Sequence, residues 1–350
     1  MSKLAAVLSL EDGTKFEGFS FGAEIQAQGE VVFNTSMIGY PELLSDPGLR
    51  GQLLVLTYPL TGNYGVPPMD EEGGLLLNFE SDGMQIAGLV VTDYSEQYSH
   101  WNAAGSLADW LKKSGVPAIC GVDTRALAQH LRDKGEMRGS ITIEGITTQK
   151  GEDENRIAAV SVKEPKIYNE GGAPTIALLD TGAKNNVIRS LVRRGAKVVR
   201  LPWDADLTAV EWDGLVLVDA PDDPSSVKDN VARALAKNKP VLGVCGGDKL
   251  MALAAGARIE KLSHSHRGAN QPVLEVGTDS AQITIQNHSW AVDEKTLPQG
   301  WTVWYRNLND GSVEGIRHET KPFAAIAWHP EATNRPADSD KIFDDFFKTL

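Results

Sequence analysis

The stretch PVLGVCGGDKLMALA, residues 240–254, joins an apolar run to a helical pattern through a single cysteine with glycines on both sides. The run before the cysteine is typical of a strand buried on both faces, and residues 248–255 are typical of a helix. Glycine tolerates the strained backbone of a tight turn between two such elements. The stretch therefore predicts a nucleophile elbow in an α/β fold, with the Cys245 side chain exposed at the carboxyl edge of the sheet.

A thiol at this turn would lie at the N-terminus of the helix that follows it. The positive potential there lowers a thiol pKa, and the first amides of the helix can form an oxyanion hole. The chain has one other cysteine, Cys120, so two buried apolar thiols, a lone disulfide and a metal pair are the alternatives to a nucleophile. Cys120 lies in an apolar run, and we interpret it as a core thiol.

A candidate base follows a second apolar strand, residues 323–327, in the sequence Trp-His-Pro-Glu, residues 328–331. The carboxyl ends of parallel strands share one edge of a sheet, so we expect His329 beside Cys245. His329 can take the thiol proton and Glu331 can orient the imidazole. This pattern favours a Cys–His–Glu triad over the structural alternatives for the cysteine.

Two further histidines, His264 and His266, are separated by one serine. They lack a neighbouring cysteine or a cluster of carboxylates, which a metal site of this kind would need. We interpret them as loop or fold residues, and no metal is predicted.

The length of 350 residues favours two domains. Residues 1–144 combine short β-type runs with helical patterns at 104–114 and 124–134, which indicates an α+β domain. Residues 145–173 are polar and rich in charge and glycine, and we interpret them as a linker. Residues 174–350 alternate strands with helices, which predicts an α/β domain with a mostly parallel central sheet. Its strands are expected at 175–179, 197–201, 214–218, 240–244, 282–286, 301–305 and 323–328, and its helices at 186–194, 226–237, 248–255 and 340–350.

The chain has 34 Lys and Arg against 47 Asp and Glu, a formal charge of −13. This balance argues against binding to nucleic acid or to an anionic membrane surface, because both need a basic face. No apolar run reaches about 18 residues, so no membrane-spanning helix is predicted. The first residues lack the long apolar stretch of a signal peptide, and two cysteines are too few for a disulfide framework. We therefore expect a cytoplasmic protein.

Around these residues the chain resembles the class I, triad-type glutamine amidotransferases, and more closely the small subunits of carbamoyl-phosphate synthase. The resemblance covers nearly the whole chain, including a first domain that generic amidotransferases lack. The first-domain motifs are GEVVFNTSMIGYPE (29–42), LTYPLTGNYG (56–65) and GVDTR (121–125). Those of the second domain are GAKNN (182–186), GANQP (268–272), QNH (286–288) and NDG (309–311).

The resemblance implies that the cysteine attacks the side-chain amide of L-glutamine, that ammonia leaves, and that water hydrolyses the thioester. Ammonia then passes to a large synthetase subunit, which joins it to bicarbonate with two ATP to give carbamoyl phosphate for arginine and pyrimidine synthesis. The resemblance thus implies a heterodimer in which ATP and Mg belong to the large subunit, with no cofactor in this chain. It assigns catalysis to Cys245, His329 and Glu331, and it places Ser36 and Asn287 at positions where the family has functional residues.

Three segments of the glutamine pocket depart from the family pattern. Residues 219–224 read Asp-Ala-Pro-Asp-Asp-Pro, where the family usually has Asn-Gly-Pro-Gly-Asp-Pro. Residues 246–249 read Gly-Gly-Asp-Lys, where it has Leu-Gly-His-Gln or Met-Gly-Asn-Gln. Residues 287–290 read Asn-His-Ser-Trp, where a glycine and another aromatic residue are usual.

These departures change the chemistry expected of the pocket. The backbone N–H groups of Ala220 and Gly246 can still form an oxyanion hole. A carboxylate at Asp222 would take up space and, close to the nucleophile, would raise the thiol pKa. Lys249 replaces a neutral donor and acceptor with a cation, which could bind a substrate carboxylate or pair with Asp222 or Asp248. Ser289 and Trp290 add bulk beside the pocket.

Three functions remain open from the sequence. The first is a glutaminase subunit of carbamoyl-phosphate synthase. The second is a paralogous Cys–His–Glu hydrolase that acts on a different amide or acyl substrate. The third is a noncatalytic scaffold that binds a partner or ligand. The kept triad argues against the scaffold, the altered pocket argues against the glutaminase, and the first domain favours the glutaminase over the paralogous hydrolase.

Overall fold

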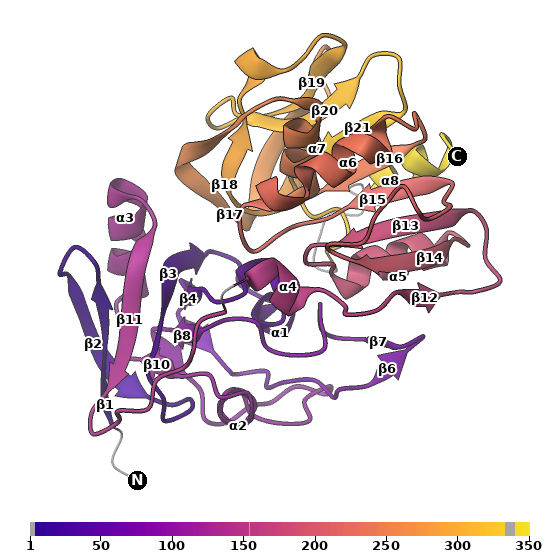
Figure 1. Cartoon of the computed structure of the whole chain (residues 1–350). Helices are drawn as coiled ribbons and strands as arrows, with labels where there is room; N and C mark the ends of the chain where they lie inside the picture. The colour runs from indigo at the N-terminus through magenta and orange to yellow at the C-terminus, as the bar shows by residue number, and fades with distance from the viewer. Residues whose placement is uncertain (1–3, 154, 333–339) are drawn as a thin grey trace. The chain divides into compact units, whose positions relative to one another are not determined.

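The computed structural model describes residues 4–153, 155–332 and 340–350. The chain forms two compact units, Met1–Arg156 and Ile157–Leu350, each with its own core. Figure 1 shows the elements of both units. The division falls inside the stretch predicted as a linker.

The first unit is built on a closed β-barrel. Around the barrel the strands follow one another as β1 (Ala5–Leu10), β11 (Met137–Ile143), β3 (Ala27–Asn34), β4 (Leu53–Leu56), β8 (Gly88–Val90), β10 (Ala118–Cys120) and β2 (Lys15–Ser20). The run from β3 through β4 and β8 to β10 is parallel, and the other pairings are antiparallel. The smaller elements of this unit are α1 (Tyr40–Leu44), η1 (Pro47–Leu49), β5 (Leu60–Thr61), β6 (Glu71–Glu72), β7 (Leu75–Leu76) and β9 (Asp93–Tyr94).

Neighbouring residues of the barrel strands face two different cores, as the alternation of side chains along a strand requires. Val31 belongs to one core and Val32 to the other. Helix α3 (Thr124–Lys134) packs on the first core and α2 (Leu107–Lys113) on the second. Helix α3 begins after Asp123, whose side chain accepts a hydrogen bond from the N–H of Ala126, so its predicted bounds are confirmed.

The second unit is built on one ten-stranded sheet. Five adjacent strands form its parallel centre, which confirms the predicted sheet type, and the remaining strands run antiparallel. In spatial order the strands are β12 (Lys166–Tyr168), β14 (Lys197–Pro202), β13 (Thr175–Asp180), β15 (Gly214–Leu217), β16 (Val241–Val244), β21 (Phe323–Ile326), β20 (Val313–His318), β19 (Trp301–Asn307), β17 (Ile259–Glu275) and β18 (Ala281–Val292).

Helices cover the parallel centre. Figure 1 shows α6 and α7 side by side, and α7 contacts β15, β16 and β21. The predicted linker contains a short helix and the edge strand β12, so part of it belongs to the folded second unit. The helical elements are α4 (Arg156–Val160), α5 (Asn185–Arg193), η2 (Pro224–Val227), α6 (Lys228–Leu235), α7 (Gly247–Ala255), η3 (Glu294–Thr296) and α8 (Lys341–Phe347).

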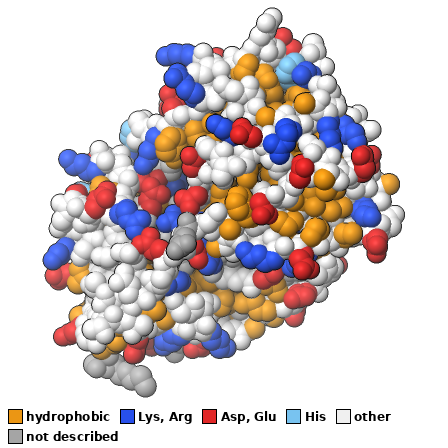
Figure 2. Space-filling view, viewed as in Figure 1, with side chains coloured by type: hydrophobic (Ala, Val, Ile, Leu, Met, Phe, Trp, Pro, Cys, Tyr) orange, Lys and Arg blue, Asp and Glu red, His pale blue; other side chains and the backbone are white. Residues whose placement is uncertain are grey.

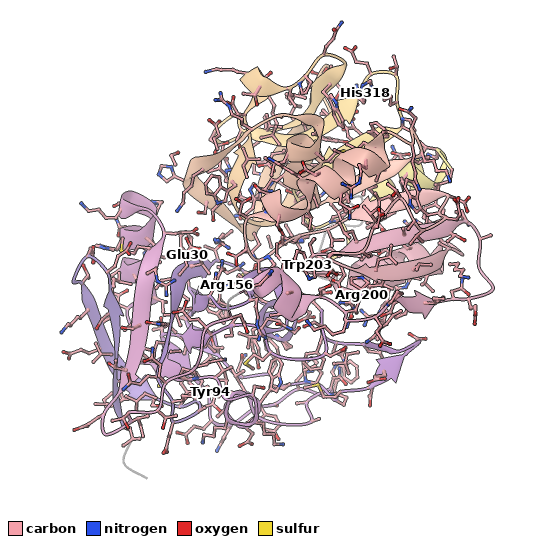
Figure 3. The ribbon with its side chains drawn as sticks, viewed as in Figure 1. Glu30, Tyr94, Arg156, Arg200, Trp203 and His318 are labelled. Carbon is pink, nitrogen blue, oxygen red and sulfur yellow. The ribbon has the colours of Figure 1, made fainter. Side chains whose placement is uncertain are left out.

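A buried ion pair fixes the carboxyl end of β13, from which the chain turns into α5. Arg200 on β14, labelled in Figure 3, donates from Nε to Asp180 Oδ2 at 2.8 Å. The other oxygen of Asp180 accepts a hydrogen bond from the N–H of Ala183 at 2.9 Å. Because both oxygens are held, the loop that carries Lys184 leaves the sheet in a fixed direction.

Charged side chains of both signs are interspersed on the face of the molecule in Figure 2. Within the described ranges, no helix has the length and apolar character needed to cross a bilayer.

Candidate active site

The predicted elbow is present between β16 and α7. Cys245 has a φ of 55°, in the left-handed region that side chains with a Cβ seldom adopt. A Cβ on Gly246 would clash with the Asp219 carboxylate, and one on Gly247 would clash with the backbone oxygen of Leu217. The glycines are therefore required by the close approach of β15 and of the loop that follows it.

The Cys245 thiol lies against the residues that follow β21. Its Sγ is 2.5 Å from Nδ1 of His329 and 3.3 Å from the backbone oxygen of Trp328. The prediction that this side chain is exposed is wrong, because these residues cover it and leave Cys245 only 3% exposed. The contact with His329 is the one that the sequence predicted.

Nδ1 of His329 has two further partners. Glu331 Oε1 lies 3.0 Å from it, and Nζ of Lys184 lies 3.1 Å from it. Lys184 Nζ is also 3.8 Å from Glu331 Oε1. One imidazole nitrogen thus faces a thiol, a carboxylate and an ammonium group, all of them buried.

The charge state of Glu331 is set by its neighbours. Burial opposes its ionisation, but His329 and Lys184 outweigh this and hold the pKa of the carboxyl below its usual value. Glu331 is therefore ionised at neutral pH. It can orient His329 and stabilise the imidazolium that forms when the thiol loses its proton.

Lys184 lies in the candidate site but was not predicted there from the sequence. It lies in the quoted motif GAKNN, but the motif alone gave it no role. The available signal was its place after β13, at the same sheet edge as Cys245 and His329.

An acidic side chain lies at the expected oxyanion hole. The N–H of Ala220 donates to Oδ1 of the preceding residue, Asp219, at 3.0 Å. The same carboxylate lies so close to Gly246 that a Cβ on this glycine would clash with it. The carboxylate therefore contacts both residues predicted to supply oxyanion-hole donors, and it competes for the N–H of Ala220.

Lys249 pairs with its neighbour in the chain, and a role in binding substrate stays a prediction. Its Nζ donates to Asp248 Oδ1 at 2.8 Å, and both side chains are buried. Burial lowers the pKa of Lys249, but the anions of Asp248 and Asp219 outweigh it and raise the pKa above its ordinary value. Asp222, the other predicted partner, is exposed in the loop before η2.

On β18, two predicted pocket residues are joined by an arginine of β17. Arg267 donates from Nη1 to Asn287 Oδ1 at 2.6 Å and from Nη2 to Ser289 Oγ at 2.8 Å. Arg267 is buried and was not predicted as a site residue. Trp290, the next residue along, is 43% exposed.

Ser36 belongs to the first unit. Its N–H donates to Asn34 Oδ1 at 2.8 Å. It lines a hollow of that unit together with Tyr40, Tyr58 and Tyr64. Its role in substrate binding stays a prediction.

In the part of the chain that the structure describes, two side-chain sets bring metal-ligating atoms close together. One is the set of Cys245, His329 and Glu331, and the other is the set of His266, His288 and Glu314. In each set the ligating atoms lie within 4.8 Å of one another.

Family models match both units. Residues 8–141 match "Carbamoyl-phosphate synthase small chain, CPSase domain", and residues 177–349 match "Glutamine amidotransferase class-I". The second match includes Cys245 and His329. The second unit is therefore a class I glutamine amidotransferase domain.

Relatives match the whole chain. The arginine-specific small chain of carbamoyl phosphate synthase from Chaetomium globosum is 42% identical over 365 residues, which cover 100% of this chain and 79% of that protein. The human mitochondrial carbamoyl-phosphate synthase [ammonia] is 45% identical, with 99% of this chain and 24% of that protein covered. The multifunctional protein CAD of Squalus acanthias is 43% identical, with coverages of 98% and 16%.

This chain belongs to the carbamoyl-phosphate synthase small-chain family, which confirms the resemblance drawn from its motifs. It spans about a quarter of the length of the human relative.

Proposed function

We propose that this chain is the glutaminase subunit of a carbamoyl-phosphate synthase. The observation that carries the proposal is the contact between Cys245 Sγ and His329 Nδ1 at a left-handed strand-to-helix turn, with the Glu331 carboxylate on the same imidazole nitrogen. The contact places the thiol within reach of an imidazole base, which an activated thiol nucleophile requires. The family membership supports glutamine as the substrate.

In the proposed reaction, His329 takes the proton of the Cys245 thiol at Nδ1, and Glu331 stabilises the resulting imidazolium. The thiolate forms a bond to the carbonyl carbon of the glutamine side chain, and the carbonyl electrons move to the oxygen. When the tetrahedral intermediate collapses, the carbon–nitrogen bond breaks and the imidazolium protonates the leaving amine, which departs as ammonia. Water then attacks the thioester, glutamate leaves, and the thiol regains its proton.

The acceptor of the ammonia is proposed to be a large synthetase subunit in a heterodimer. ATP and Mg²⁺ for the synthesis of carbamoyl phosphate are assigned to that partner, with L-glutamine or a related small amide bound by this chain. The proposed setting is the cytoplasm, in arginine or pyrimidine synthesis. The name of the Chaetomium globosum relative, an arginine-specific small chain, supports such a pathway.

Ammonia release from glutamine by the purified full chain, with and without a large subunit, tests this proposal. Cys245→Ala serves as the blank, because it removes the nucleophile and leaves the fold. We expect release from the wild-type chain that exceeds the blank by at least about 1,000-fold. Equal release from both proteins in the presence of the partner would contradict the proposal.

The oxyanion hole favours a second candidate, a chain that binds the synthetase without hydrolysing glutamine. The Asp219 carboxylate engages the N–H of Ala220, and negative charge there opposes a developing oxyanion. The human relative, which is 45% identical to this chain, carries ammonia and not glutamine in its name, and this supports the second candidate. Complex formation without glutaminase activity would select this candidate.

A further inference from the structure

Three buried side chains meet on the antiparallel part of the second unit's sheet, outside the Cys245 site. His266 comes from β17, His288 from β18 and Glu314 from β20. Their ligating atoms lie within 4.8 Å of one another, and the three residues are 5%, 8% and 0% exposed. Buried imidazole nitrogens and carboxylate oxygens need hydrogen-bond partners or a bound ion. The partners of each atom therefore show what the cluster can bind.

The far nitrogen of each histidine is held by an oxygen acceptor. Nε2 of His266 lies 2.9 Å from Asp310 Oδ2, and Nδ1 of His288 lies 3.0 Å from the backbone oxygen of Trp290. In neutral rings, each of these nitrogens would carry the proton, so Nδ1 of His266 and Nε2 of His288 would present lone pairs. Histidines that bind a metal are oriented in this way, with the free ring N–H on a carboxylate or a backbone carbonyl.

The lone pairs face a carboxylate. Glu314 Oε1 lies 2.8 Å from Nδ1 of His266 and accepts a hydrogen bond from Asn307 Nδ2 at 2.9 Å. Glu314 Oε2 lies 3.4 Å from Nε2 of His288, and neither atom has a hydrogen-bond partner within the described residues. Two buried electron-pair donors thus face each other, and a cation between them would satisfy both.

We propose that His266, His288 and Glu314 form a binding site for a divalent transition metal of the zinc type. Two imidazoles and one carboxylate suit zinc and its neighbours, whereas calcium and magnesium prefer oxygen ligands alone. Zinc would take these three ligands and keep a fourth position for water. A metal there would tie β17, β18 and β20 together and fix the strand that carries Asn287 and Ser289.

The competing account is a metal-free ion pair in which His266 is protonated and bridges Glu314 and Asp310. The two accounts differ in what they require. A bound metal needs His266, His288 and Glu314 as ligands. The ion pair needs only His266 with Glu314 and Asp310, and it does not involve His288. Direct metal binding therefore decides between them.

The binding experiment uses the full chain carrying Cys245→Ala, because Cys245 with His329 and Glu331 is a second potential metal site. The protein is treated with a chelator, dialysed and titrated with Zn²⁺ by calorimetry and with Co²⁺ by visible absorption. We expect one equivalent of metal per chain and the intense visible bands of four-coordinate Co²⁺. A chain that binds no stoichiometric Zn²⁺ would overturn the proposal.

Variants in the same background assign the ligands. Glu314→Gln and His288→Gln are expected to weaken Zn²⁺ binding by at least about 100-fold, and Asp310→Asn, which loses only the carboxylate behind His266, by about 10-fold. His264→Gln, an exposed histidine of the same strand, is the matched control and should bind like the parent. Far-UV circular dichroism checks that each variant is folded. Binding that survives Glu314→Gln and His288→Gln in folded protein would contradict the proposal.

Discussion

The second unit contains two buried clusters that each include histidine and glutamate. They differ in the hydrogen-bond partners of the histidine ring nitrogens. In the nucleophile cluster, Nδ1 of His329 faces Cys245, Glu331 and Lys184 at once. In the histidine cluster, formed by His266, His288 and Glu314, each outer ring nitrogen has one oxygen partner. A nitrogen with competing partners can exchange a proton among them, whereas a nitrogen with one partner holds its ring in place.

Both clusters bury a histidine beside a glutamate, so this feature does not distinguish them. What distinguishes the nucleophile cluster is a group that can lose a proton and attack, placed by a left-handed turn at a sheet edge. The side chains of the histidine cluster include no such group, and they come from β17, β18 and β20 in the antiparallel part of the sheet. We therefore expect mutations of the first cluster to change the rate and those of the second to change stability.

The largest expected effect is that of His329→Gln. Loss of the base should lower kcat for glutamine hydrolysis by about 1,000-fold, since general-base catalysis contributes up to about four orders of magnitude. The exposed control His264→Gln should keep the parent kcat. Ammonia release at saturating glutamine measures both. A His329→Gln variant with the parent rate would remove the distinction between the two clusters.

The second effect is on stability. In the metal-free protein, the fully buried Glu314 is the anion that faces His266, His288 and Asn307, and Glu314→Gln removes that charge. We expect the free energy of unfolding to fall by about 3 kcal/mol, as is typical when one member of a buried ion pair is removed. Urea unfolding in the presence of a chelator measures it. Glu319→Gln, at an exposed position of the same unit, should change little, and an equal loss there would contradict the assignment.

The nucleophile cluster could be predicted from the sequence because its members lie at strand ends. The glycines around Cys245 and the segment after the strand at 323–327 place both groups at one edge, and the structure confirms their contact. Helix 124–134 could be predicted equally well, because its capping residue lies next to it in the chain.

The histidine cluster could not be predicted, because its carboxylates lie 44 and 48 residues beyond His266 in the chain. Only the pairing of β17 with β19 and of β19 with β20 brings them together. Strand β17, 17 residues long, was missed because polar and charged residues interrupt its apolar pattern. The proximity of Asp219 to Gly246 likewise depends on two loops from different strands.

The third effect concerns the N–H of Ala220, an expected oxyanion-hole donor that is hydrogen-bonded to Asp219. Asp219→Asn removes the negative charge beside Ala220 and Gly246, so we expect kcat for glutamine to rise by about 10-fold, a fraction of what one oxyanion donor contributes. Asp229→Asn changes an exposed carboxylate of α6 and should leave kcat unchanged. Steady-state ammonia release compares the two. Equal rates for Asp219→Asn and the parent would show that this carboxylate leaves the oxyanion hole free.

The smallest effect is a displacement of the pH profile by Lys184→Met. Glu331 acts as an anion, so activity is lost as the pH falls through its pKa. Burial raises that pKa, while His329 and Lys184 lower it with the greater combined effect. Removing the ammonium group therefore raises the pKa of Glu331 and moves the acid limb of kcat/KM to higher pH. The stability that the ionised carboxylate contributes, present above the usual glutamate pKa, should likewise be lost at a higher pH on acidification.

The matched control is Lys228→Met, which removes an exposed cation from α6 and should leave the acid limb in place. The pH profile of glutamine hydrolysis is compared for the parent and both variants. A shift to lower pH in Lys184→Met, or equal shifts in both variants, would contradict the role of Lys184. An upward shift in Lys184→Met alone would show that the ammonium group beside His329 acts locally on the charge of Glu331. The histidine cluster has no lysine among its three side chains, so this effect would separate the two clusters.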